Sequence, residues 1–253
     1  MMPTLTIPLI ERRAWVDFIK TTPWEQGEHT VCIAPTGRGK SVLFRAWCWR
    51  RDWVVWCSTK KKDTEYNRQM QLGYERFSQW PIKKPPRDER HQYALLWPHY
   101  NKLVDVYKAA PVFRKMLEDV YEDEGWTVVL DDLFFLSEKL KLRNEISALN
   151  YQVRSLNATL VSALQRPRRI PLETWDQASH AFLRPLGNYD DLLTVRSLAH
   201  VHHKVLETWL RSLKPFEWLY LPVSRTDEYE PCIVKPPLGR INLNGSHSNN
   251  NDQ

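Results

Sequence analysis

Residues 32–41 read CIAPTGRGKS, between the apolar run HTVCIA (29–34) and the apolar-patterned run GKSVLFRAWCWRR (39–51). The stretch matches the phosphate-binding loop pattern G-x-x-x-x-G-K-[ST], except that Ala34 stands where the pattern opens with glycine. A strand before the loop and a helix after it are the context that the motif requires. The alternative is a chance Gly-Lys-Ser turn, which this context disfavours. The stretch therefore predicts a nucleotide site in an α/β fold.

Each position of the loop has an expected task. Gly37 and Gly39 let successive backbone N–H groups converge on phosphate oxygens. Lys40 is expected to reach the β- and γ-phosphates, the Ser41 hydroxyl is expected to ligate Mg²⁺, and the helix beginning near Lys40 points its positive end at the same anion. ATP and Mg²⁺ are the cofactors that the loop predicts. The predicted nucleotide-binding residues are Pro35, Thr36, Gly37, Arg38, Gly39, Lys40 and Ser41.

A second strand supplies carboxylates. TVVLDD (127–132) is an apolar run that ends in two aspartates. Asp131 is predicted to hold Mg²⁺ through water, with Ser41 on the other side. Asp132 is predicted to orient and polarise the attacking water as a general base. A strand that ends in a solvated acidic turn is the alternative, and the phosphate loop upstream argues against it.

A third strand ends in an amide. ATLVSALQ (158–165) is apolar up to Gln165, and Arg166 and Pro167 follow, so the proline ends the strand. In ATPases with an extra strand between the loop strand and the acidic strand, a polar sensor of the γ-phosphate stands at this position. Gln165 is predicted to contact that phosphate or the lytic water.

The order of these motifs resembles a known family. APTGRGKS (34–41), VVLDD (128–132) and ALQRP (163–167) recur in this order in the FtsK/HerA superfamily of DNA-pumping ATPases. VVWCSTKKKD (54–63) resembles the second strand of such proteins, which a lysine and an acidic residue follow, and IPLETWDQASHAFLRP (170–185) resembles their next segment, in which a strand carries an arginine. The resemblance covers residues 29–222.

The resemblance implies a RecA-like P-loop NTPase with a mostly parallel sheet flanked by helices. It further implies that ATP hydrolysis drives translocation of double-stranded DNA, usually by a homo-hexameric ring, with packaging or transfer proteins as further partners. A glutamate normally follows the metal-binding aspartate in these ATPases, and Asp132 is one methylene shorter.

An arginine from a neighbouring subunit is a further implication. Arg154, in YQVRS (151–155), stands where the family often has a Gly-Arg pair whose arginine reaches the neighbouring site, although Val153 replaces the glycine. A surface helix residue is the alternative for Arg154, and Arg184 is a second candidate for the same task. Together with Asp132 and Gln165, Arg154 completes the predicted catalytic set.

Two other functions compete with the motor. One is a nucleotide-gated switch that binds DNA or a partner protein with little turnover. The other is a small-molecule P-loop kinase, which places the loop strand and the acidic strand differently. The order of the strands in the sheet therefore tests the kinase hypothesis. The rate of ATP hydrolysis tests the switch hypothesis.

The chain of 253 residues suits one domain. We expect a lead-in over 1–28 that packs on the main domain, an ATPase domain over 29–240, and a disordered Asn-rich tail over 241–253. The net charge of +6 permits contact with a polyanion without establishing it. The basic residues that could face DNA phosphates, with solvated loop charge as the alternative, are Lys60, Lys61, Lys62, Arg166, Arg168 and Arg169.

The remaining patterns concern location and metals. The start of the chain lacks the pattern of a signal peptide and no apolar run reaches the length of a membrane span, so we expect a cytoplasmic protein, in the host cytoplasm if a virus or mobile element encodes it. Cys32 and Cys57 are predicted to be buried free thiols. The histidines of HVHH (200–203) are predicted to be surface residues and not metal ligands.

The periodicity also predicts the remaining elements. Helices are expected over 62–80, 111–125, 136–156 and 190–213, and further strands over 53–59, 92–98, 179–185, 217–223 and 231–237.

Overall fold

A computed structural model describes residues 7–61, 66–82, 92–98, 100, 103–167, 171–224 and 228–238. The predicted tail over 241–253 lies outside the described residues, as do Lys62, Arg168 and Arg169.

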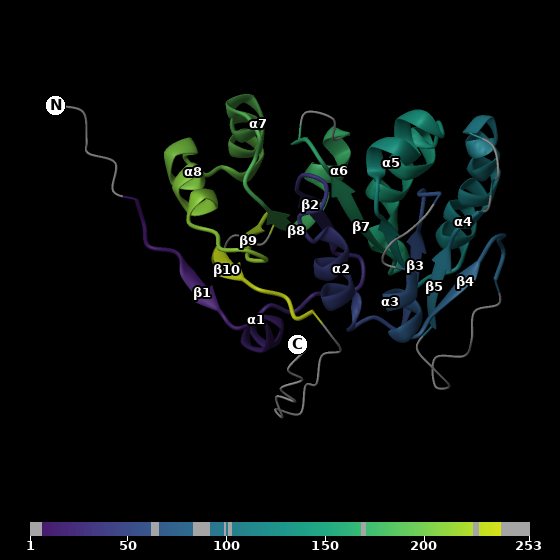
Figure 1. Ribbon diagram of the computed structural model, residues 1–253, viewed down its shortest axis with the longest axis horizontal. Coiled ribbons are helices and arrows are strands. Elements are labelled where there is room, and N and C mark those ends of the chain that lie inside the picture. Colours follow the sequence, from purple (N-terminus) through teal and green to yellow (C-terminus); the bar gives the residue numbers. More distant parts are fainter. Residues whose placement is uncertain are drawn as a thin grey trace.

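The strands form one ten-stranded sheet in the order β1-β10-β9-β8-β2-β7-β6-β3-β5-β4 (Figure 1). All strands expected from the sequence are present, and β1 and β4 are additional. The strands are β1 (Glu11–Arg13), β2 (His29–Ile33), β3 (Trp53–Cys57), β4 (Tyr74–Phe77), β5 (Gln92–Leu96), β6 (Thr127–Leu130), β7 (Thr159–Leu164), β8 (Ala178–Leu183), β9 (Trp218–Pro222) and β10 (Cys232–Val234).

Helices connect most of the strands. The α-helices are α1 (Trp15–Thr21), α2 (Lys40–Cys48), α3 (Tyr66–Gln71), α4 (Ala110–Glu122), α5 (Arg143–Gln152), α6 (Leu172–Asp176), α7 (Tyr189–Ala199) and α8 (His203–Arg211). The described residues also include the 3-10 helices η1 (Leu103–Ala109) and η3 (Val153–Leu156) and the π-helix η2 (Phe135–Lys139).

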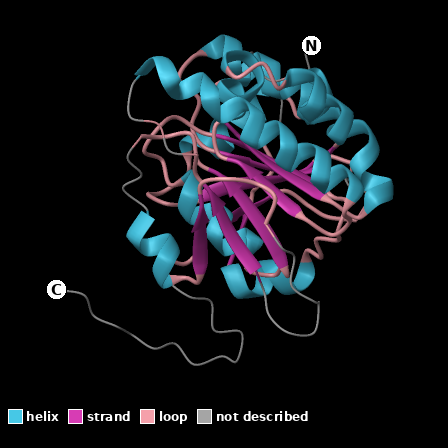
Figure 2. Cartoon of the chain, turned by 90° about the vertical axis from the view of Figure 1, so that its right-hand side faces the viewer, coloured by secondary structure: helices cyan, strands magenta, loops and turns pink. Residues whose placement is uncertain are grey.

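The sheet is mostly parallel. β9 is antiparallel to both of its neighbours, β8 and β10, and the other strand pairs are parallel. Helices cover both faces of the sheet (Figure 2). This arrangement confirms the predicted α/β class with a mostly parallel sheet flanked by helices.

Two cores fill the space between the sheet and its helices. On one face α4–α8 contribute side chains such as Phe113, Ile146 and Trp209, and on the other α1–α3 contribute side chains such as Phe18 and Phe44. Successive residues of β2 and β6 enter opposite cores, so both faces of these strands are buried. This burial explains why the central strands read as continuous apolar runs.

The predicted helix over 62–80 is wrong. In its described part α3 ends at Gln71, Gly73 adopts φ 91°, and the chain turns into the edge strand β4. The Tyr74 ring then stacks on Tyr93 of the neighbouring strand at 5.2 Å between centroids. A positive φ is incompatible with continuing a right-handed helix, so the glycine ends it.

Two other predicted helices are interrupted. The stretch 136–156 breaks between η2 and α5, where Lys141 has φ 59°. The stretch 190–213 breaks between α7 and α8, where His200 has φ 53°. In both cases one residue that is not glycine adopts a left-handed backbone conformation, and this conformation ends the helical run.

The lead-in contributes to both the sheet and a core. β1 pairs in parallel with β10 near the far end of the chain. The rings of Trp15 and Phe18 in α1 lie 6.2 and 5.7 Å from the Trp47 ring of α2, centroid to centroid. Residues 11–21 therefore add the outermost strand of the sheet and part of its core.

Candidate nucleotide site

The predicted site residues follow strands that all point the same way. β2, β7, β6 and β3 are neighbours and parallel, so their carboxyl ends meet at one edge of the sheet. Ligands of open α/β sheets bind outside this edge. The phosphate loop follows β2, Gln165 follows β7, Asp131 follows β6 and Lys60 follows β3.

The loop has the backbone of a phosphate cradle. Gly37 and Gly39 adopt φ 74° and 85°, the left-handed region that glycine enters without steric cost. Gly39 is the N-cap residue of α2 and provides no side-chain cap, and the first turn of α2 carries no acidic residue. The N–H groups at the helix start are thus left for an anion. Ala34 is buried, has no positive φ and donates its N–H to the Leu164 carbonyl at 3.0 Å, so alanine fits here in place of glycine.

Lys40 lies across its own loop. Its Nζ donates to the carbonyl oxygens of Ala34 at 2.7 Å and Pro35 at 3.1 Å. Burial lowers the pKa of the Lys40 ammonium, and the nearby carboxylates Asp131 and Asp132 act in the opposite direction. The lysine predicted to bind phosphate is therefore partly desolvated and close to both aspartates.

Asp131 forms an ion pair that spans two strands. The Nζ of Lys60, which follows β3, lies 2.9 Å from Oδ2 of Asp131, whose side chain is only 6% exposed. The Lys60 backbone is itself held, because the Trp97 indole N–H donates to its carbonyl at 2.6 Å. Lys60 thus fixes the carboxylate predicted to bind metal.

Asp132 has a different environment. Its Oδ1 accepts a hydrogen bond from the Phe135 N–H at 3.0 Å, just before the π-helix η2. Burial raises the pKa of the Asp132 carboxyl, the neighbouring Asp131 raises it further, and the Phe135 hydrogen bond acts against them. A raised pKa suits a carboxylate that must accept a proton.

The strand that ends in glutamine lies where the ATPase hypothesis requires it. β7 is hydrogen-bonded to β2 on one side and β6 on the other, so it separates the loop strand from the acidic strand. Gln165, one residue past β7, is exposed at the site edge. This strand order argues against the small-molecule kinase.

The two arginines differ in how they are placed. Arg184, which follows β8, donates through Nη1 to the Lys214 carbonyl at 3.1 Å and to the Glu217 carbonyl of the same chain. Burial lowers the pKa of its guanidinium, and Arg38 of the phosphate loop adds to this effect. The Arg184 side chain is thus committed to its own subunit. The backbone of Arg154 lies in η3, and its side chain is outside the described part of the structure.

The donors at this edge suit Mg²⁺ bound together with a triphosphate. Ser41 offers a hydroxyl in the first turn of α2, and Asp131 offers a buried carboxylate. Within the described ranges no three His, Cys, Asp or Glu side chains gather as a metal cage. Mg²⁺ usually takes one or two carboxylates and completes its shell with water and phosphate oxygens, so the donor set fits this ion.

The Lys60–Asp131 pair was not predicted. Lys60 was expected to face DNA or solvent, and only the adjacency of β3 and β6 brings it to the aspartate. The family pattern of a lysine after the second strand was the one signal for it. Lys61 and Arg166 are exposed, and their contact with DNA stays a prediction.

The histidines of residues 200–203 serve the helices. His202 Nδ1 accepts from the Lys204 N–H at 3.3 Å and caps α8, while His200 ends α7. All four cysteines are buried and unpaired.

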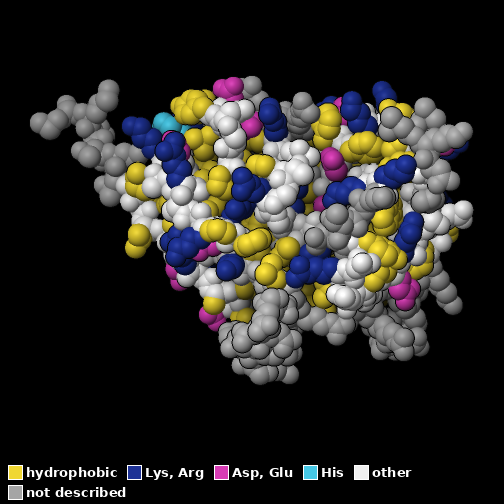
Figure 3. Space-filling view, in the orientation of Figure 1, with side chains coloured by type: hydrophobic (Ala, Val, Ile, Leu, Met, Phe, Trp, Pro, Cys, Tyr) yellow, Lys and Arg dark blue, Asp and Glu magenta, His cyan; other side chains and the backbone are white. Residues whose placement is uncertain are grey.

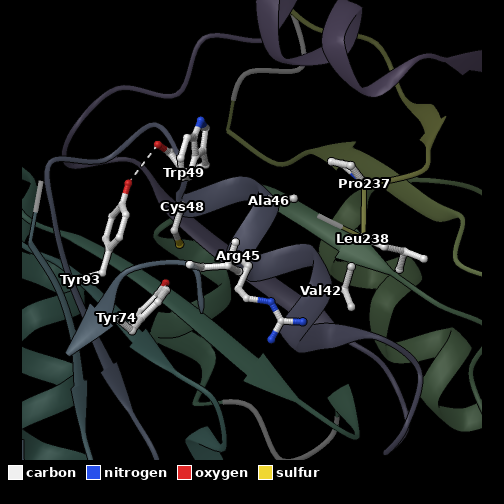
Figure 4. A pocket seen from close by; sticks show the side chains of 10 residues that line it. Val42, Arg45, Ala46, Cys48, Trp49, Tyr74, Tyr93, Pro237 and Leu238 are labelled. Carbon is white, nitrogen blue, oxygen red and sulfur yellow. Dashed lines mark hydrogen bonds between the residues drawn. The ribbon is translucent and has the colours of Figure 1, made fainter. Parts of the chain in front are cut away.

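A small pocket on the outer face of α2 is separate from this site. Val42, Ala46 and Trp49 line it together with Tyr93 and Leu238, and the Tyr93 hydroxyl donates to the Trp49 carbonyl at 3.2 Å (Figure 4). None of the predicted site residues lines this pocket.

Comparisons with known proteins agree with the geometry. No protein-family model matches the chain, and no curated protein matches it in sequence. Among solved structures, the genome-packaging NTPase B204 from Sulfolobus turreted icosahedral virus 2, in complex with sulfate, is 11% identical, with a TM-score of 0.59 over 86% of this chain and 100% of that one. The same NTPase in complex with ATP-gammaS gives 14% identity and a TM-score of 0.57 over 85% of this chain and 100% of that one.

Proteins of conjugation and secretion match in the same way. VirB4 of Thermoanaerobacter pseudethanolicus is 10% identical, with a TM-score of 0.56 over 83% of this chain and 89% of that one. The pCW3 conjugation coupling protein TcpA is 15% identical, with a TM-score of 0.51 over 82% of this chain and 59% of that one. No helix in the described ranges is long and apolar enough to cross a membrane. The chain has the fold of the FtsK/HerA-type P-loop ATPases.

Proposed function

We propose that this protein is an ATP-hydrolysing motor that moves double-stranded DNA, in packaging, conjugative transfer or segregation. The observation that carries the proposal is the position of β7 between the loop strand β2 and the acidic strand β6, with Gln165 one residue past its end. This arrangement offers a phosphate cradle, a candidate base and a candidate sensor at one sheet edge. A sensor at this position suits a protein that responds to the hydrolysis of its nucleotide.

The chain's own residues divide the work of hydrolysis. The loop N–H groups and Lys40 bind the phosphates, and Lys40 must leave the Ala34 and Pro35 carbonyls to do so. Ser41 and Asp131 would hold Mg²⁺, which when bound neutralises charge that develops on the phosphates. Asp132 orients the attacking water and accepts its proton. Gln165 contacts the γ-phosphate or that water, and so transmits the state of the nucleotide to β7.

Contact with DNA is supported by the kinds of protein that share the fold, and the charge of the chain permits it. The net charge is +6, and in Figure 3 Lys and Arg side chains are spread over the visible face and not gathered in one patch. A net positive charge permits contact with the phosphate backbone, while a clustered basic face would be the direct mark of a DNA-binding surface. We propose a homo-oligomeric ring, a hexamer by resemblance to the family, with Arg154 reaching the neighbouring site. Packaging or transfer proteins are proposed as further partners.

The four buried, unpaired cysteines fit a reducing compartment, and we propose that the motor works in the cytoplasm.

The proposal is tested by steady-state ATP hydrolysis with and without linear double-stranded DNA. We expect DNA to increase the rate, and Lys40→Ala to abolish both the basal and the stimulated activity because the phosphates lose their lysine. Lys20→Ala is the matched control, because it removes an exposed lysine of α1 that belongs neither to the loop nor to the candidate DNA contacts. ATP binding without stimulated turnover would contradict the motor and favour the nucleotide-gated switch.

A further inference from the structure

Phe216 lies beside the phosphate loop. It belongs to the turn Lys214–Glu217 between α8 and β9. Because β9 is antiparallel to β8, the start of β9 lies at the same sheet edge as the end of β8 and the loop. A methyl group placed on Gly39 would lie 3.9 Å from Cδ1 of Phe216, so the ring is a direct neighbour of the last loop glycine.

The backbone of Phe216 is in a conformation that favours glycine. Its φ is 65°, and the Glu217 N–H donates to the Lys214 carbonyl at 3.1 Å across Pro215 and Phe216. Proline followed by a residue with positive φ is the pattern of a type II turn, whose third position is normally glycine. A bulky side chain there is strained, and such outliers cluster at ligand sites.

Packing does not account for the phenylalanine. Its side chain is 48% exposed, and it is the one exposed phenylalanine or tryptophan among the described residues. The turn is nevertheless held firmly: Arg184 binds the carbonyls at both ends, and the Glu217 carboxylate accepts from the Lys214 N–H at 2.8 Å. The Arg184 N–H in turn donates to the Ile33 carbonyl at 3.0 Å, so the turn is tied to the loop strand itself.

The layout of the site fixes the direction of a bound nucleotide. Asp131 and Asp132 lie on the β6 side of β2, so the γ-phosphate must point toward that side. The ribose and base must then leave the loop toward β8 and β9, where the Phe216 ring stands. We propose that Phe216 is a stacking platform for the base of the bound nucleoside triphosphate. The inference rests on the proposed nucleotide site and deepens it.

Stacking defines the class of ligand. An aromatic ring accepts any base, because every base has a π-face, and the larger face of a purine gains more than that of a pyrimidine. We therefore assign the site to purine nucleoside triphosphates, with modest discrimination against pyrimidines.

The test compares ligands with and without a base. Calorimetry measures the Kd of ATP and of inorganic tripolyphosphate, each with Mg²⁺, for the unaltered chain and for Phe216→Ala. We expect the alanine variant to weaken ATP about 10-fold and to leave tripolyphosphate unchanged. Phe216→Tyr keeps the ring and should bind ATP as the unaltered chain does. Tyr107→Ala, which removes an exposed aromatic side chain from η1, should have no effect.

The variant Phe216→Gly distinguishes a loss of ATP binding from a loss of folding. Glycine relieves the positive φ, so we expect an unchanged or higher melting temperature together with the same loss of ATP affinity. Unchanged ATP affinity in both variants, or equal loss for ATP and tripolyphosphate, would overturn the inference and leave the nucleotide site standing. Failure of the unaltered chain to bind either ligand would overturn the proposed function, and the inference with it.

Discussion

Asp132 is the residue at which chemistry and stability conflict. Burial raises its pKa above the ordinary aspartate value of 3.8, so ionisation at neutral pH is less favourable in the folded chain than in the unfolded one. The charged carboxylate therefore lowers the free energy of unfolding at neutral pH. This destabilisation disappears as the pH falls below the ordinary aspartate pKa of 3.8. The same shift brings the carboxylate closer to the working pH of a general base.

We expect Asp132→Asn to lower ATP turnover by about 100-fold or more, with the Kd for ATP little changed. The amide oxygen still accepts from the Phe135 N–H, and the desolvated charge is gone, so the melting temperature at pH 7 should hold or rise. Turnover assays, calorimetric binding and thermal unfolding measure the three effects.

The pH dependence of the unaltered chain is the companion measurement. Because the base acts when deprotonated, kcat/KM should fall on acidification with an apparent pKa above 3.8. The Asp132→Asn variant should lack this fall of kcat/KM at acidic pH. Full turnover in the variant would show that another residue is the base.

At the residue scale the sequence predicted the parts of the site but not all of their contacts. Lys40, Ser41 and Gln165 lie at the one sheet edge where the motifs require them. The Lys60–Asp131 ion pair depends on β3 lying next to β6, which no spacing along the chain specifies. The place of Phe216 beside the loop was not predicted, because its turn uses phenylalanine where the pattern favours glycine.

At the scale of elements, the break between α7 and α8 is the least expected feature. His200, an exposed residue with φ 53°, ends α7 in the left-handed conformation, where glycine is usual. The helical periodicity of 190–213 runs through this position without glycine or proline, so the sequence predicted one helix.

We expect His200→Gly to stabilise the fold by about 0.5–1 kcal/mol, because glycine adopts the left-handed C-cap without steric cost. Chemical denaturation of the variant measures the change. His200→Ala is the control, and it should be neutral or destabilising because alanine keeps the strain. Loss of stability in the glycine variant would mean that the His200 side chain contributes an interaction of its own.

β4 shows a different limit of prediction. Of its four residues only Tyr74 is buried, because β4 is the outermost strand at its end of the sheet. Four residues with one buried side chain cannot establish a period of two. The central strands, buried on both faces, gave long apolar runs and were predicted within one or two residues.

At the scale of the whole molecule, the sheet joins the two ends of the described chain. β1 and β10 pair at one edge, and β7 sits in the middle between the loop strand and the acidic strand. The sequence predicted the central order through the family resemblance, whereas the role of the lead-in as an edge strand came from the structure alone.

The proposed ring makes a specific prediction about mixed subunits. Lys40→Ala removes a subunit's own site, and Arg154→Ala removes the arginine that it lends to its neighbour. Each variant alone should be inactive. In an equal mixture about a quarter of the interfaces pair an intact site with an intact arginine, so partial ATP turnover should return.

The control for this mixture is a double variant that carries both substitutions, which should restore nothing when mixed with either single variant. An inactive equal mixture, with rings confirmed by light scattering, would contradict transfer of Arg154 to a neighbouring site.

Displacement of a third strand from duplex DNA tests the motor most directly. A short labelled oligonucleotide bound in the major groove of a linear duplex is released only when a translocating protein passes its site. We expect release that requires ATP, depends on the length of duplex leading to the third strand, and is absent with Lys40→Ala. Hydrolysis of ATP without release, under conditions in which the protein binds the duplex, would contradict translocation.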